Sequence, residues 1–170
     1  LINKVFEIIE ACKIFDFDKS KYRIMIHPQS YVHSIIRYKN GLIKMILYNT
    51  DMKIPISNTL YGSKNNIVNI RKIDAKVLSK LSFQSVDIKK FPSIKLIKKC
   101  LTLGILTPTI VNAANEVLVN MFLNKKIGFL DIVSTINRIF QDKDFKKYAT
   151  RNAASINEVK NTDNWARLKT

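Results

Sequence analysis

The sequence predicts an α+β protein, in which a helix and an antiparallel hairpin sheet, forming part of an α/β catalytic domain, precede a small carboxyl-terminal helical bundle. Three observations support this class. Apolar residues recur at helical spacing from Asn3 to Phe15, two alternating runs flank Asn40-Gly41, and helical spacing returns in several segments beyond Pro92. The chain therefore changes from mixed to helical character along its length.

The first half contains three expected elements. A helix over 3–15 has a polar side and an apolar side, and a short strand is expected within 22–26. Alternating residues over 31–38 and 42–48 predict two strands. The Asn40-Gly41 pair between them favours the positive φ angles of a tight turn, so the two strands should form a hairpin.

Helical elements dominate the rest of the chain. Pro55 suits the first turn of a short helix over 53–60, because proline lacks the amide hydrogen that the first turn leaves free. Four later segments carry apolar residues at helical spacing: 94–103, 108–123, 129–140 and the residues after Ser155. Gly128 followed by Asp131 predicts the end of one helix and the start of the next.

The basic, turn-rich stretch between the two halves predicts the domain organisation. We expect residues 1–76 to be the carboxyl-terminal part of a catalytic and connective domain, 77–91 to be a linker, and 92–170 to be a helical domain.

Composition favours a globular protein of a reducing compartment. Hydrophobic residues make up 46% of the 170 residues and charged residues 25%, which allows a sizeable core. Cys12 and Cys100 lie in apolar helical patterns without paired spacing, so both thiols are expected to fill space in the interior. No apolar run long enough to span a bilayer occurs, and we expect no membrane partner.

The formal net charge of +16 raises an alternative function, a non-catalytic basic module that binds nucleic acid. Lysine accounts for 23 of the 29 basic residues, as a compositional bias would produce. Four lysine pairs are scattered rather than interleaved with aromatic residues on one face: Lys89-Lys90, Lys98-Lys99, Lys125-Lys126 and Lys146-Lys147. Solvated lysines are the favoured interpretation, and we expect no nucleic-acid partner.

Five motifs occur in a fixed order along nearly the whole chain. They are Asn3-Lys4-Val5-Phe6-Glu7, His27-Pro28-Gln29-Ser30, Asp51-Met52, Asn112-Ala113-Ala114-Asn115-Glu116 and Ile127-Gly128-Phe129-Leu130-Asp131. Together they resemble the 1-deoxy-D-xylulose 5-phosphate reductoisomerase family. The resemblance implies a bacterial cytoplasmic homodimer that converts this phosphorylated sugar to 2-C-methyl-D-erythritol 4-phosphate in isoprenoid biosynthesis, using NADPH and Mg²⁺ or Mn²⁺.

The resemblance also implies that this chain is the carboxyl-terminal half of such an enzyme, complete at its far end. The amino-terminal half, which carries the NADPH-binding domain and other metal-binding carboxylates, would be missing. No cofactor-binding residue is therefore expected here, and the fragment alone should be inactive.

Three residues of the first motif carry the expected site. By resemblance, Glu7 binds the metal and substrate hydroxyls, Asn3 binds substrate oxygens, and Lys4 binds substrate and neutralises charge during the reaction, so Lys4 and Glu7 are the catalytic residues. A helix start suits an anion independently of any family. The alternative is an ordinary surface pair of Lys4 and Glu7, which would contribute only about 0.2–0.5 kcal/mol.

Other motif residues have supporting roles. His33 and Met52 are expected to shape the site without carrying the chemistry, and His27 to fix a turn. Met52 could instead be a core residue that fills a gap. Asn112, Asn115 and Glu116 are expected to cap a helix start and to form hydrogen bonds between domains.

Three positions depart from the family pattern. Val5 stands where the family usually has glycine, Thr50 where it has proline, and Lys53 where it has arginine. The charged and amide residues of the site are retained, so the departures bear on the edge of the pocket.

Overall fold

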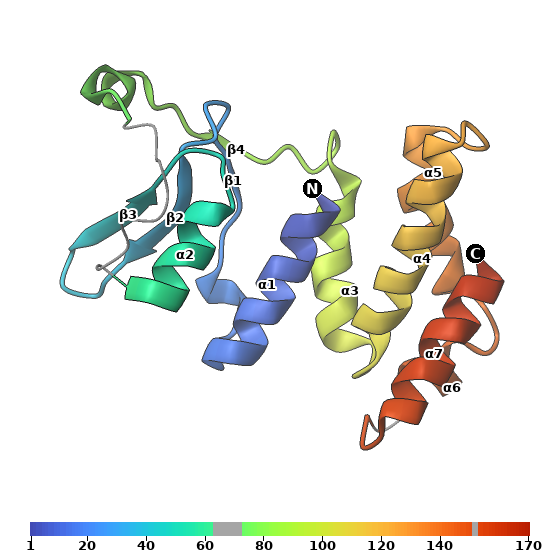
Figure 1. The fold of residues 1–170 in the computed structure, drawn as a ribbon. Coiled ribbons are helices and arrows are strands. Elements are labelled where there is room, and N and C mark those ends of the chain that lie inside the picture. The colour runs from blue at the N-terminus through green and yellow to red at the C-terminus, as the bar shows by residue number, and fades with distance from the viewer. Residues whose placement is uncertain (63–72, 151–152) are drawn as a thin grey trace. The chain divides into compact units, whose positions relative to one another are not determined.

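A computed structural model of the chain describes residues 1–62, 73–150 and 153–170. The helices and strands follow one another as Figure 1 shows: α1 (Ile2–Phe15), η1 (Lys19–Lys21), β1 (Met25–Ile26), β2 (Val32–Arg37), β3 (Ile43–Leu47), α2 (Lys53–Tyr61), η3 (Ala75–Lys80), β4 (Gln84–Ser85), η4 (Pro92–Lys95), α3 (Leu96–Thr102), α4 (Thr107–Leu123), α5 (Phe129–Ile139), α6 (Phe145–Ala149) and α7 (Ile156–Lys169). The elements labelled η are short 3₁₀ helices. Helices dominate and the described strands form two small antiparallel sheets, so the predicted α+β class is confirmed.

Two compact units make up the chain, and each is described by itself. The helical unit comprises Leu1–Arg23 and Asp87–Thr170, and the hairpin unit comprises Ile24–Val86. These limits differ from the expected ones, because α1 packs against η4 and α3 and so belongs with the carboxyl-terminal helices. The division of a parent enzyme into functional domains at 76 and 91 stays a prediction.

The stretch expected to be a linker contains ordered structure. It includes the end of η3 and the whole of β4, which pairs antiparallel with β1 through Met25 with Ser85 and Ile26 with Gln84. This pairing joins segments far apart in sequence, which no local pattern predicts. Residues 63–72 of the expected connector lie outside the described residues.

Helix α1 has two different sides, as its sequence predicts. Val5 is fully buried and Ile9 nearly so, while polar residues occupy the opposite side. The helix ends at Asp16, whose φ of 50° is left-handed. The chain then returns along the helix, and the Tyr22 hydroxyl donates a hydrogen bond to the Ala11 carbonyl oxygen at 2.9 Å.

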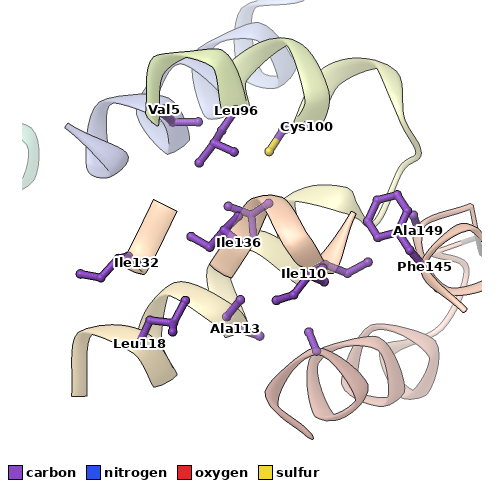
Figure 2. Packing of buried hydrophobic residues seen from close by; sticks show 14 of the residues in the cluster. Val5, Leu96, Cys100, Ile110, Ala113, Leu118, Ile132, Ile136, Phe145 and Ala149 are labelled. Atoms are coloured by element: carbon purple, nitrogen blue, oxygen red, sulfur yellow. The ribbon is translucent and has the colours of Figure 1, made fainter. Parts of the chain in front are cut away.

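A single apolar cluster joins the helices of the helical unit. Figure 2 shows Val5 of α1 beside Leu96 and Cys100 of α3, with Ile110 of α4 and Ile136 of α5 beneath them. The helical spacing predicted over 108–123 is confirmed, because apolar residues of α4 that share one face are buried or packed against this cluster: Val111, Ala114, Leu118, Met121 and Phe122. The buried alanines of α4 allow neighbouring helices to approach closely.

The later helices begin where the sequence indicates. The Gly128 amide donates to the Asp131 carboxylate at 2.8 Å, which starts α5. Ser155 caps α7, since its hydroxyl oxygen accepts from the Glu158 amide at 3.3 Å. Helix α6 has no counterpart in the sequence analysis, because its five residues are too few for a periodic pattern.

The hairpin unit contains the predicted β2–β3 hairpin. Ile35 pairs with Met45, Ile36 with Lys44, and a bulge interrupts the register near His33. Gly41 has a φ of 89°, which glycine adopts without strain, so the turn forms where Asn40-Gly41 predicts it.

Among the described helices, none combines the length and apolar character that crossing a bilayer requires.

Candidate functional site

The exposed side of α1 carries Asn3, Lys4 and Glu7 together. All three are exposed, whereas Val5 and Ile9 on the other side anchor the helix in the core. Residues four apart lie on one face of a helix, so Asn3 and Glu7 project in the same direction. Burial of one side thus fixes the orientation of the polar side.

Lys4 and Glu7 form an ion pair, with 2.5 Å between Nζ and Oε2. The two side chains are 47% and 46% exposed. Pairs at this exposure contribute little, about 0–1 kcal/mol, because water screens them and both side chains lose freedom. A ligand could therefore separate the pair at low cost, leaving the ammonium for an anionic group and the carboxylate for a cation.

The first turn of α1 adds an amide side chain to these two charged groups. No side chain caps the start of α1, and the Asn3 side chain makes no hydrogen bond to any described residue. The Asn3 side chain can therefore donate to and accept from a ligand.

The donors present suit a hard divalent cation but do not complete a site. The Glu7 carboxylate offers the oxygen ligands that Mg²⁺ and Mn²⁺ prefer. Among the described residues, no group of three or more His, Cys, Asp or Glu side chains could hold a metal ion. Glu7 can therefore supply one ligand, and the others would have to come from elsewhere.

His33 is held by the hairpin unit in which it lies. Its Nε2 donates to the Tyr48 carbonyl oxygen at 3.1 Å, and its ring stacks on the Tyr48 ring with 3.7 Å between centroids. Both contacts cross from β2 to the residue after β3. They fix the ring beside the bulge, which fits a residue that shapes its surroundings.

His27 and Met52 have contrasting surroundings. His27 begins a turn closed by the Ser30 amide, and its Nδ1 donates to the Ser82 carbonyl oxygen at 2.8 Å. Met52, just before α2, is 66% exposed. The interpretation of Met52 as a gap-filling core residue is wrong for the described chain, and its contact with a nicotinamide stays a prediction.

The Asn112 and Glu116 motif was expected to cap a helix start, and this expectation is wrong. Both residues lie inside α4, which begins earlier at Thr107. The Asn112 side-chain amide donates to Glu116 Oε1 at 3.1 Å, and Arg167 of α7 donates to Glu116 Oε2 at 2.6 Å. The motif therefore connects α4 to α7.

Arg167 completes this connection. Its Nε donates to Asp163 Oδ2 at 2.6 Å, and the hydrogen bonds to Asp163 and Glu116 raise the pKa of the guanidinium above its usual range. One cation thus holds carboxylates on two helices.

Glu10 is a site candidate that the sequence analysis missed. It follows Glu7 by three residues and Asn3 by seven, a spacing that places it on the same exposed face of α1, and this spacing could have identified it. Glu10 and Phe6 line a groove in the helical unit, whereas Asn3, Lys4 and Glu7 are not among its lining residues.

Comparison with known sequences places this chain in a protein family. Residues 47–169 match the family described as DXP reductoisomerase C-terminal domain. The chain is 38% identical to the 1-deoxy-D-xylulose 5-phosphate reductoisomerase of Pelagibacter ubique over 99% of this chain and 44% of that protein. The enzyme of the same name from Wolbachia pipientis is 38% identical over 99% of this chain and 43% of its own length.

Solved structures give the same correspondence. The reductoisomerase from Zymomonas mobilis in complex with NADPH superimposes with a TM-score of 0.86 at 34% identity, covering 99% of this chain and 43% of that one. A reductoisomerase in complex with NADPH, fosmidomycin and magnesium has a TM-score of 0.90 at 30% identity, covering 98% and 42%. The chain thus spans about two fifths of the length of the relatives it matches.

Proposed function

The chain belongs to the 1-deoxy-D-xylulose 5-phosphate reductoisomerase family, and on this premise we propose that it is the carboxyl-terminal part of such an enzyme. The parent enzyme would convert 1-deoxy-D-xylulose 5-phosphate to 2-C-methyl-D-erythritol 4-phosphate in isoprenoid biosynthesis, in the bacterial cytoplasm. The observation that carries the proposal is the joint presentation of Asn3, Lys4 and Glu7 on the exposed side of α1.

Each of the three residues has a role that its chemistry supports. The Asn3 amide can both donate to and accept from substrate oxygens. The Lys4 ammonium would stabilise the substrate phosphate and the negative charge that develops on oxygen. Glu7 would supply a metal ligand and accept hydrogen bonds from substrate hydroxyls.

The bound Mg²⁺ or Mn²⁺ would supply Lewis-acid polarisation of the substrate oxygens, and NADPH the hydride. Similar proteins support both groups, since their structures were solved with NADPH and with magnesium. Because Glu7 alone cannot hold a cation tightly, we expect the remaining ligands and the NADPH-binding surface to belong to the rest of the parent enzyme.

The supporting residues of the hairpin unit belong to the same proposal. His33, fixed by its stack on Tyr48, would shape the substrate pocket. Met52, which is exposed, would pack against the nicotinamide side of the cleft.

The β2–β3 hairpin supports a further part of the proposal, homodimer formation by the parent enzyme. Both faces of the hairpin expose apolar residues: Ile35, Ile43 and Met45 on one face, Ile36 and Ile46 on the other. A two-stranded sheet is marginally stable alone, and exposed apolar patches mark contact surfaces. Light scattering on the full-length enzyme would test this, since a monomer would contradict it.

No described feature favours the nucleic-acid module. The lysine pairs lie on different parts of the helical unit: before η4, in α3, between α4 and α5, and in α6. Lys99 is also occupied, because its Nζ donates to Asn137 at 2.7 Å and lies 4.4 Å from the Phe140 ring centroid.

A spectrophotometric assay of NADPH oxidation tests the proposed reaction. The full-length parent should turn over 1-deoxy-D-xylulose 5-phosphate with Mg²⁺, and the 170-residue chain alone should not. In the parent, Glu7→Gln should abolish turnover, while the control Asp16→Asn, at the other end of α1, should preserve it. Turnover by the chain alone would refute the dependence on the remaining sequence.

A further inference from the structure

The ion pair between Lys4 and Glu7 bears on how the candidate site takes up its ligands. Lys4 Nζ lies 2.5 Å from Glu7 Oε2, and neither side chain has another hydrogen bond or ion pair to the described residues. Glu7 is also the residue of this site that offers an oxygen ligand to a divalent cation. The lysine ammonium and a metal ion would therefore compete for one carboxylate.

The two charged groups can separate without a change in the fold. Val5 is fully buried and Ile9 nearly so, which holds the backbone of α1 in place beneath the pair. Both charged side chains are close to half exposed, and the lysine stem is flexible, so the ammonium can swing into solvent. The lysine precedes the glutamate, which is the less favourable order of such a pair on a helix. The contact is thus readily reversible.

A divalent cation and the ammonium cannot share the Glu7 carboxylate without repulsion. Both would lie beside the same two oxygen atoms, where like charges repel each other at close range. The divalent ion carries twice the charge of the ammonium and takes carboxylate oxygens as direct ligands. Binding of the metal should therefore displace Lys4 from Glu7.

This displacement would change the charge that the exposed side of α1 presents. While they are paired, Lys4 and Glu7 are together neutral. When a metal ion takes Glu7, the carboxylate neutralises only half of the metal charge and the ammonium is released, so the site becomes positive. A positive site attracts an anion, and a lysine ammonium is a common ligand of phosphate groups.

We infer that Lys4 is an internal competitor of the metal ion at Glu7, and that its release couples metal binding to the binding of an anionic substrate. The inference rests on the proposed function, which assigns Glu7 to the metal and Lys4 to the substrate. Such coupling is reciprocal, because the anion must strengthen metal binding by the same factor as the metal strengthens anion binding.

The Mn²⁺ affinity of the full-length parent enzyme, measured without turnover, tests the competition. Lys4→Gln removes the competing ammonium and should bind Mn²⁺ about two- to fivefold more tightly, the gain that loss of a half-exposed ion pair permits. Lys4→Arg keeps a cation beside Glu7 and should not show this gain. An affinity of Lys4→Gln equal to or below that of the parent enzyme would overturn the inference.

Lys13→Gln is the matched control for the loss of one positive charge. Lys13 is exposed on the same helix, six residues beyond Glu7, a spacing that does not bring two side chains together. Its substitution should leave the Mn²⁺ affinity nearly unchanged. A gain in Lys13→Gln equal to that in Lys4→Gln would indicate a general effect of charge and would overturn the competition at Glu7.

Inorganic phosphate is the probe for the coupling, with the Mn²⁺ that phosphate itself binds measured in enzyme-free solution. Phosphate should strengthen Mn²⁺ binding to the parent enzyme. The strengthening should be about two- to fivefold smaller in Lys4→Gln, where no ion pair has to be broken. Equal strengthening in the two proteins would contradict the coupling.

Glu7→Gln separates a failure of this inference from a failure of the proposed function. If Glu7→Gln binds Mn²⁺ as tightly as the parent enzyme does, Glu7 is not a ligand, and the proposed metal site and the competition both fail. If Glu7→Gln weakens Mn²⁺ binding and Lys4→Gln does not strengthen it, the proposed metal site stands and the competition alone fails.

Discussion

The helical unit and the β2–β3 hairpin use their apolar residues in opposite ways. Leu96, Ile110 and Ile136 are at most 1% exposed, whereas Ile35 and Met45 of the hairpin are 42% and 45% exposed. The core residues of the helical unit are thus covered within that unit, whereas these hairpin residues are exposed. Stability should therefore depend on the first region, and association on the second.

Removing side-chain volume from the helical core should have the largest effect. Ile110→Ala should lower the free energy of unfolding by about 2–5 kcal/mol, because it removes buried contacts and leaves a cavity. Ile43→Ala in the hairpin, where the side chain is 58% exposed, should change it by less than about 1 kcal/mol. Urea unfolding followed by circular dichroism compares them, and equal losses would remove the distinction between the regions.

Substitution of a glycine in the helical unit should lower the free energy of unfolding nearly as much. Gly104 has a φ of 152°, and an added Cβ would collide with the backbone of Ala149. Gly104→Ala should therefore lower the free energy of unfolding by at least about 1–3 kcal/mol, as backbone strain adds to the clash. Gly41→Ala is a useful comparison, because its added Cβ meets open space and only its φ of 89° resists substitution. A thermal melt in which Gly41→Ala was the more damaging change would contradict this ranking.

Thiol chemistry should separate two positions within the helical unit. Burial raises the pKa of Cys100 to about 12, whereas Cys12 is only half-buried. Cys100 should therefore react with a thiol-specific reagent much more slowly than Cys12 in the folded chain. Because the folded thiol resists ionisation, stability should also decrease as pH rises above the ordinary thiol pKa, and Cys100→Ser should lessen that decrease. Equal reaction rates of the two thiols would contradict the placement of Cys100 in the core.

The smallest effect on stability should come from removing the surface ion pair of Lys169 and Asp142, in which Nζ and Oδ2 lie 3.0 Å apart. A hydrogen bond from the Asp144 amide, with Lys169, lowers the pKa of Asp142. A carboxyl group whose pKa is lower in the folded chain than in the unfolded chain contributes stability at pH values above the unfolded-state pKa. This contribution is lost as the pH falls through the folded-state pKa. Asp142→Asn should therefore destabilise the chain slightly at neutral pH and not in strong acid. An effect that grew on acidification would have the wrong sign.

Local sequence patterns predicted most individual elements but not how they group. The spacing of Val5 and Ile9 predicted α1, and Asn40-Gly41 predicted the hairpin turn. The sequence did not reveal that α1 packs with helices from the far end of the chain, or that β1 pairs with β4, because both contacts join distant segments. Helix α6 was too short to show periodicity.

The candidate site shows the same limit. Asn3, Lys4 and Glu7 share one helical turn, so local spacing was enough to bring them together. The capping role expected for Asn112 and Glu116 was wrong, because both lie inside α4, and their partner Arg167 comes from another helix, which local spacing does not reveal. Similarly, Cys100 is a core residue as predicted, whereas Cys12 is only half-buried, a difference that depends on neighbours rather than on pattern.

Manganese affinity is the most direct test of the proposal that Glu7 completes a metal site. Electron paramagnetic resonance of Mn²⁺ would compare the full-length parent enzyme with its Glu7→Gln variant, with Asp16→Asn as the control. We predict that the enzyme and the control bind Mn²⁺ alike and that Glu7→Gln binds it at least about tenfold more weakly, as expected when a charged ligand is lost. Unchanged Mn²⁺ affinity in a folded Glu7→Gln enzyme would contradict the account.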